Sequence, residues 1–89
     1  MASRTYNGVL ITGPTGKIEW INAGFTRLTG YTAEEVLDRH PDYFLMGPDT
    51  SPDALAEKRR ARQELRGFHI EILNYRKDGQ TIWILADGQ

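Results

Sequence analysis

The sequence contains few histidine and serine side chains and no cysteine, and their spacing does not match a known catalytic motif. The chain has two histidines, His40 and His69, and two serines, Ser3 and Ser51, but no cysteine. No serine, histidine and acid follow a recognisable triad arrangement. Gly13-x-x-Gly16 lacks the Lys-Ser/Thr ending of a phosphate-binding loop. We therefore expect no enzyme activity from this chain, and the absence of cysteine excludes disulfides, thiolate metal sites and thiol nucleophiles.

Metal binding is not predicted either. Asp38, Asp42 and Asp49 are oxygen ligands of the kind that hard cations prefer, but nothing in the sequence brings them together. We interpret them as solvated loop residues and helix caps. His40 falls in an irregular loop and His69 on the outer phase of a strand, so both are interpreted as surface residues.

Two polar side chains have the chemistry of a binding site. Asn74 shares a strand face with isoleucines and therefore needs a hydrogen-bond partner, which a ligand, a backbone group or a water would supply. Arg59 lies on a polar helical stretch, where it would either bind an anionic ligand group or remain solvated with its stem packed. The sequence leaves both alternatives open for each residue.

Length and charge limit the remaining classes. The 89 residues form one small domain, and 11 basic against 12 acidic residues leave a net charge of −1. Glu57 and Glu64 flank the basic run at residues 58–62, so we expect a solvated helix face and no nucleic-acid partner. No apolar run reaches the length of a membrane span, so we expect no membrane partner. The absence of cysteine fits a cytoplasmic location.

The hydrophobic pattern predicts the element order β-β-α-α-α-β-β. Strands are expected at Val9–Thr12 and 17–21, around a Gly/Pro turn, and at Phe68–Tyr75 and 81–85, around an Asp-Gly turn. Two short helical pieces cover residues 23–30 and 32–37, and the second opens with a capping box of Thr32 and Glu35. A third helix is expected at 53–66, with Leu55, Ala61 and Leu65 facing inward.

Strand alternation assigns the two faces of the sheet. Phe68, Ile70, Ile72 and Asn74 share one face, which must cover the helices. Three short helices cannot cover both faces, and the opposite face is still apolar. We expect a partner there, such as a second copy of the chain, on an interface of Trp20, Leu73, Tyr75, Trp83 and Leu85.

Several motifs resemble the PAS family. They are Asn22 followed by Phe25, then Leu-Thr-Gly-Tyr at 28–31, Glu-Val-Leu at 35–37, and Leu-Asn-Tyr-Arg-Lys-Asp-Gly at 73–79 with Trp83. Phe-Leu-Met-Gly-Pro-Asp-Thr at 44–50 is similar to a loop of the LOV branch. The resemblance covers residues 7–89 as one PAS domain. It implies an α+β fold with an antiparallel sheet in the order 2-1-5-4-3 and helices over one face.

LOV domains bind flavin mononucleotide and form an adduct with one cysteine. On this resemblance Arg59 matches a phosphate-binding arginine and Asn74 a ring-binding asparagine. The other positions differ, because the cysteine is replaced by Asp42, an asparagine by Pro41, an arginine by Tyr43, a glutamine by Met46 and a second asparagine by Ile84. Most ring-binding groups are missing, and adduct chemistry is excluded. The helix at 53–66 has no histidine, so haem bound in the way some PAS domains bind it is not expected.

The resemblance also implies a fifth strand between the first and the fourth. We expect that strand beyond residue 89, together with a C-terminal output domain, and without it two strand edges would stay unpaired. We predict a sensory or interaction module of a bacterial-type signalling protein, whose parent is a histidine kinase or cyclic-dinucleotide enzyme. The alternatives are a dimerisation scaffold without ligand and a flavin photoreceptor without adduct. The expected pocket residues, besides Asn74 and Arg59 at the rim, are Phe25, Leu28, Tyr43, Met46, Leu55, Ile70, Ile72, Ile82 and Ile84.

Overall fold

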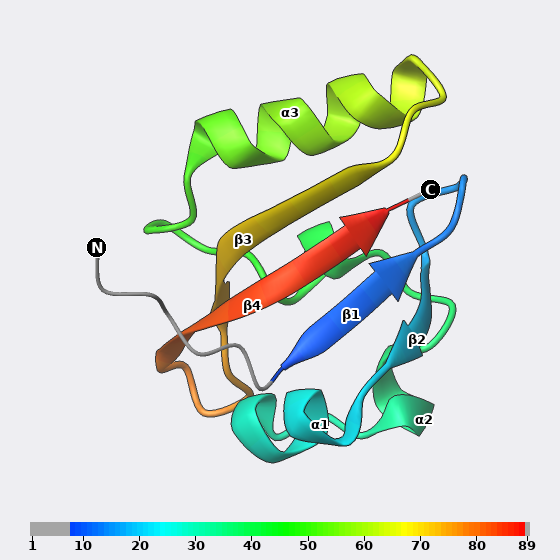
Figure 1. Ribbon diagram of the computed structural model, residues 1–89. Helices are drawn as coiled ribbons and strands as arrows, with labels where there is room; N and C mark the ends of the chain where they lie inside the picture. The colour runs from blue at the N-terminus through cyan, green and yellow to red at the C-terminus, as the bar shows by residue number, and fades with distance from the viewer. Residues whose placement is uncertain (1–7, 89) are drawn as a thin grey trace.

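The chain folds as a four-stranded sheet with helices packed against one of its faces (Figure 1). The structure is a computed structural model that describes residues 8–88, so the two ends of the expected domain, Asn7 and Gln89, lie outside the described residues. The elements in chain order are β1 (Val9–Thr12), β2 (Ile18–Ile21), α1 (Ala23–Thr29), α2 (Ala33–Val36), the 3₁₀ turn η1 (Pro41–Tyr43), α3 (Pro52–Gln63), β3 (Phe68–Tyr75) and β4 (Thr81–Gly88).

The strand order is β2-β1-β4-β3, which confirms the predicted order of these four strands. One pairing differs from expectation. β1 pairs directly with β4, in parallel, from Val9↔Leu85 to Thr12↔Gly88, whereas the other two pairs are antiparallel. The prediction that two strand edges stay unpaired is therefore wrong. β4 continues to Gly88, beyond its predicted end at residue 85, and its backbone N–H and C=O groups form hydrogen bonds with those of β1.

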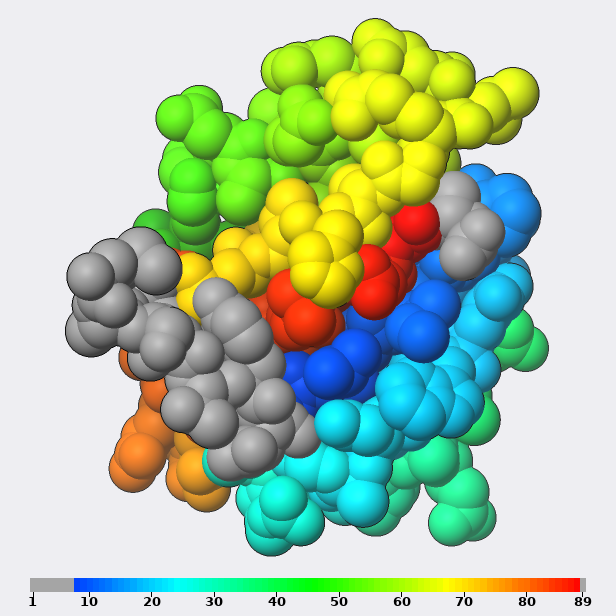
Figure 2. Space-filling view, viewed as in Figure 1, coloured from blue at the N-terminus to red at the C-terminus, as the bar shows by residue number. Residues whose placement is uncertain are grey.

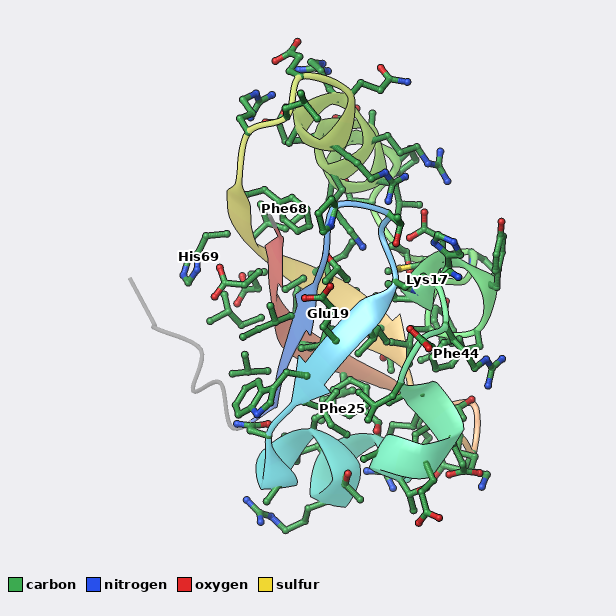
Figure 3. All side chains as sticks on the ribbon, turned by 90° about the vertical axis from the view of Figure 1, so that its right-hand side faces the viewer. Lys17, Glu19, Phe25, Phe44, Phe68 and His69 are labelled. Atoms are coloured by element: carbon green, nitrogen blue, oxygen red, sulfur yellow. The ribbon has the colours of Figure 1, made fainter. Side chains whose placement is uncertain are left out.

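The core lies between the sheet and the helices. Its fully buried side chains come from every layer and are Leu10, Ile18, Phe25, Val36, Leu45, Ile72, Ile84 and Ala86. In Figure 3, Phe25 points from α1 toward the sheet, while His69 points away from the opposite face of β3. The alternation read from the sequence is thus confirmed, because Ile72, Asn74 and Ile84 are buried and His69 is exposed.

The end of α3 departs from the sequence prediction. The helix stops at Gln63, and Leu65, which we expected to face inward, is 87% exposed. Leu65 adopts a left-handed conformation with φ of 58°, and the N–H of Arg66 donates to the carbonyl of Ala61 across it. This hydrogen bond closes a helix-ending motif of six residues, in which glycine usually holds the left-handed position. Here Leu65 holds it, so the helix ends before the boundary that Gly67 predicted.

Both short helices begin at a side-chain cap, and the cap of α2 is the one that the sequence predicts. Thr32 Oγ1 accepts from the N–H of Glu35, and the Glu35 carboxylate accepts from the N–H of Thr32, which confirms the capping box. Asn22 caps α1, since its Oδ1 accepts from the N–H of Phe25 at 2.8 Å and from the N–H of Val9 at 2.9 Å. One side chain therefore joins the start of α1 to the start of β1.

Replacing Asn22 by alanine is expected to lower the free energy of unfolding by about 1–2 kcal/mol, because the N–H groups of Val9 and Phe25 lose the side-chain oxygen that accepts from them. Urea denaturation of the Asn22→Ala variant measures the loss. Asn22→Asp is the matched control: it keeps the oxygen acceptor at a helix N-terminus and should stay close to wild type. An alanine variant as stable as wild type would contradict the cap.

Candidate functional site

Asn74 is the most unusual polar residue of the interior. Its side chain is 0% exposed, and neither Oδ1 nor Nδ2 has a hydrogen-bond partner among the described residues. It lies on the inner face of β3 and pairs in register with Ile82 of β4. A buried amide without partners costs folding free energy, and a ligand with matching donor and acceptor groups would remove that cost.

The backbone on either side of Asn74 is firmly held. Thr50 Oγ1 donates to the carbonyl of Leu73 at 2.8 Å, and the N–H of Tyr75 donates to the carbonyl of Leu45 at 2.7 Å. The Tyr75 ring packs over Gly47, where an added Cβ would lie only 2.5 Å from Tyr75 Cε1. The loop at residues 45–50 therefore fixes the end of β3 and, with it, the direction of the Asn74 side chain.

The structure brings most of the predicted pocket residues around the same interior. Phe25, Ile72 and Ile84 are fully buried, and Met46, Leu55, Ile70 and Ile82 are partly buried against them. Leu28 is also partly buried. Tyr43 does not join them, since it is 81% exposed and its ring contacts His40 at a centroid distance of 5.4 Å. Side chains fill this interior, and no pocket opens within residues 8–88.

A second polar cluster, which the sequence reading only partly identified, lies between α3 and η1. Asp42 Oδ1 and Oδ2 lie 3.4 Å from Lys58 Nζ and 3.4 Å from an Arg59 nitrogen, respectively. The Lys58 side chain is only 5% exposed, and the ring centre of Phe68 is 5.9 Å from its ammonium. We expected a solvated helix face at residues 58–62, and the burial of Lys58 shows that this expectation is wrong for that residue.

Burial lowers the pKa of the Lys58 ammonium below its ordinary value of 10.5, and the neighbouring cations Arg62 and Arg59 add to that effect. The Asp42 carboxylate opposes both and raises the pKa through charge and a hydrogen bond. Within residues 8–88, Asp42 is the acidic group that pairs with this ammonium, and its charge offsets the cost of burying Lys58.

The residues that the LOV resemblance assigns to a flavin do not reproduce that site. Asn74 offers a free amide, but Met46 and Ile84 supply no amide to a ring edge. Arg59, which matches the phosphate position, already shares Asp42 with Lys58. An ammonium and its carboxylate thus occupy the region between loop and helix, and the donor set does not fit flavin mononucleotide.

Neither histidine takes part in a metal cluster. His69 Nδ1 lies 2.6 Å from Asp87 Oδ1 on the outer face, and His40 contacts Tyr43. Within residues 8–88 no three histidine or acidic side chains come together as metal ligands. The same part of the chain contains no helix with the length and apolar character needed to cross a membrane.

The outer face of the sheet is open to solvent on β1, β2 and β4 (Figure 2). Trp20 is 50% exposed and Trp83 is 38% exposed, while Leu73 and Leu85 are half-buried. Tyr75 is engaged within the chain, because its hydroxyl oxygen accepts from the N–H of Asp49 at 2.9 Å. An apolar surface therefore remains, centred on the two tryptophans.

Comparison with known proteins gives consistent matches. A family model described as a PAS domain matches residues 7–88. A blue-light-activated histidine kinase from Rhizobium johnstonii is 52% identical over 62 residues, which cover 70% of this chain and 18% of that protein. A voltage-gated delayed rectifier potassium channel from Rattus norvegicus is 40% identical over 77 residues, covering 84% of this chain and 8% of the channel.

A solved structure agrees with the architecture. The LOV domain of a blue-light activated histidine kinase from Erythrobacter litoralis matches with a TM-score of 0.65 and 30% identity, over 75% of this chain and 61% of that chain. The chain spans less than a fifth of the length of the two curated relatives, 18% of the kinase and 8% of the channel.

Proposed function

Because the chain belongs to the PAS domain family, we propose that it is the sensory module of a signal-transduction protein and that a small polar molecule bound at Asn74 is its input. The module itself performs no catalysis. A histidine kinase and a potassium channel are among its relatives, and a domain common to proteins with such different outputs supports a role in sensing rather than in the output itself.

The unpaired amide of Asn74 carries this proposal. A ligand with one acceptor and one donor side by side, such as an amide, a carboxylic acid or a heteroaromatic ring edge, would satisfy both Nδ2 and Oδ1. The surrounding isoleucines, Phe25 and Met46 would supply an apolar wall. Since side chains fill the interior, such a ligand has to displace them, and α3 is the layer that would move outward.

We propose the outer sheet face as the route of output. A second copy of the chain would cover Trp20, Leu73, Trp83 and Leu85 and form a homodimer. In this proposal the parent protein is cytoplasmic and an output domain follows this one; the histidine kinase among the relatives supports the presence of an output domain. The interface and the output belong together, because a ligand that shifts the sheet changes the surface that the partner contacts.

Two other functions make different predictions. A flavin photoreceptor without adduct would purify as a yellow protein with a blue absorption band, and the donor set argues against it. A dimerisation scaffold would carry no small molecule and would be favoured by the filled interior.

Native mass spectrometry of the purified protein tests the proposal. We expect a retained small molecule that is lost in the Asn74→Leu variant, because leucine fills a similar volume without hydrogen-bonding groups. The matched control is Asn22→Asp, a polar position outside the interior, which should keep the molecule. A protein that carries no added mass, from several expression hosts, would favour the scaffold and contradict the proposal.

A further inference from the structure

The β1–β2 turn and the C-terminal end of α3 lie at the same end of the sheet (Figure 1), and Figure 3 shows the turn below α3. Gly16 in this turn is buried and has a φ of 85°, a conformation that favours glycine. A Cβ added to Gly16 would overlap with the guanidinium of Arg62, at 2.9 Å from Cζ, and would lie 3.2 Å from Nδ1 of His40. The turn, α3 and the residue before η1 therefore meet at one point, where a guanidinium packs on the glycine backbone.

The backbone of β2 holds His40 beside this turn. The N–H of Ile18 donates to the carbonyl of Arg39 at 2.9 Å, and the N–H of Asp38 donates to the carbonyl of Ile18 at 2.9 Å. The ring of His40 packs edge-on against Tyr43, and neither ring nitrogen makes a hydrogen bond within residues 8–88. The imidazole is thus fixed next to Gly16 and remains available to a ligand.

Arg62 differs from the other arginines of α3, because it is half-buried and has no acidic partner. Arg59 lies 3.4 Å from a carboxylate oxygen of Asp42. Arg60 lies 2.9 Å from a carboxylate oxygen of Glu57. Arg62 makes neither an ion pair nor a hydrogen bond with any residue that the structure describes. Its guanidinium carries five N–H donors in a planar fork that matches the oxygens of a carboxylate or a phosphate.

Positive charge exceeds negative charge around Arg62. Lys58 and Arg59 share the carboxylate of Asp42. Burial is the main cause that lowers the pKa of Lys58, and the charge of Arg62 lowers it further, so these two cations repel each other. An anion bound to Arg62 would reduce this repulsion.

The excess of positive charge covers only a small area. The carboxylate of Glu57 pairs with both Arg60 and Arg66, and Glu64 pairs with Arg66 as well. A polyanion such as a nucleic acid is bound by many cations along its backbone. The charge at Arg62 matches a single anionic group instead.

We propose that Arg62, His40 and the β1–β2 turn bind a small oxyanion, which is a phosphate or carboxylate group of a ligand. The guanidinium of Arg62 holds two oxygens of this group through parallel N–H donors. His40 donates a ring N–H to the same group. Gly16 is required in the turn, because any side chain there would displace the guanidinium.

This oxyanion site is separate from the interior around Asn74. The β1–β2 turn follows Thr12, which pairs with Gly88. Gly88 in turn pairs with Phe68, at the beginning of β3. Asn74 lies six residues further along that strand, about 20 Å away at 3.4 Å per residue. The proposal therefore goes beyond the proposed function and does not depend on a ligand at Asn74.

An NMR titration with inorganic phosphate, at an ionic strength held constant with sodium chloride, tests the site. We expect saturable shifts of the backbone N–H of Gly16 and of the side-chain Nε–H of Arg62. In Arg62→Gln the Kd for phosphate should rise about tenfold or more, because hydrogen bonds to a charged group are lost. A parallel titration with acetate distinguishes the two ligand classes. Saturation by phosphate alone assigns the site to phosphorylated compounds, saturation by acetate assigns it to carboxylates, and saturation by neither contradicts the proposal.

Arg27→Gln is the matched control. Arg27 on α1 also lacks an acidic partner in the described part of the chain, but its side chain is exposed, so this variant should bind phosphate as wild type does. Shifts in wild type that do not saturate, or that centre on Arg27, overturn the site, and this result needs no variant to fold. An Arg62→Gln protein that circular dichroism shows to be folded, and that binds phosphate as tightly as wild type, overturns it as well.

Discussion

Replacing Asn74 by leucine is expected to raise the free energy of unfolding of the ligand-free protein by about 1–3 kcal/mol. The folded state leaves two polar atoms of this side chain buried without partners, while the unfolded state exposes them to water. Leucine has a similar shape and removes that penalty. Urea denaturation monitored by tryptophan fluorescence measures the difference.

Asn74→Asp is the informative companion to this variant. A carboxylate at the same position would be buried without a partner, so the variant should be much less stable than wild type at neutral pH. It should recover stability as the pH falls and the carboxyl group becomes protonated. If Asn74→Leu were instead less stable than wild type, the amide would have a partner in solution, and the argument for a ligand site would lose its basis.

The stability expected to be gained by Asn74→Leu is the reason to interpret Asn74 as a functional residue. A domain of this size is stabilised by only roughly 5–15 kcal/mol, so an unsatisfied amide in the interior is a substantial fraction of the total. Residues that conflict with stability in an otherwise consistent fold tend to mark sites of function. The other buried polar side chains each make a hydrogen bond within residues 8–88, so the point of conflict is Asn74, whose two polar atoms make none there.

Much of this site could be predicted from sequence because it depends on local rules. The period of two in β3 assigned Asn74 to the inner face, and the spacing of Thr32 and Glu35 predicted the capping box. These features need only the geometry of one element. What alternation could not show is that Asn74 lacks a partner, because that depends on every side chain packed around it.

The features that sequence missed are set by contacts between distant segments. The parallel pairing of β1 with β4 joins residues at opposite ends of the chain. The burial of Lys58 depends on the packing of α3 against β3 and on the position of Asp42. Tyr75 was expected on the outer face, but it contacts the loop at 45–50 instead. None of these contacts leaves a periodic pattern in the sequence.

The second large effect is expected at Asp42. Asp42→Asn should lower the free energy of unfolding by about 1–3 kcal/mol, because it leaves the buried ammonium of Lys58 without its counter-charge. Arg59 contributes little to this loss, since its side chain is 55% exposed. Lys58→Met should be neutral or stabilising, because a chain of similar length then fills the same space without a charge.

The double variant identifies the mechanism. If Asp42 acts through Lys58, Asp42→Asn should cost little once Lys58 is methionine, so the two substitutions will not add. Urea denaturation of the four proteins completes this cycle. A double variant that shows the full cost of Asp42→Asn would mean that the carboxylate stabilises some other part of the loop.

The pH dependence of stability gives an independent measure of the same ammonium. Burial lowers the pKa of Lys58 in the folded state below 10.5, so in the interval between that lowered pKa and 10.5 the unfolded chain binds more protons than the folded one. The free energy of unfolding therefore rises with pH across this interval, because the folded state loses its buried charge.

Wild type should gain stability relative to Lys58→Met as the pH is raised. Asp42→Asn should begin to gain stability at a lower pH, because the loss of the carboxylate lowers the pKa of Lys58 further. Parallel pH profiles for wild type and Lys58→Met would contradict this prediction. They would show that water reaches the ammonium and that Lys58 is not buried beside Phe68 in solution.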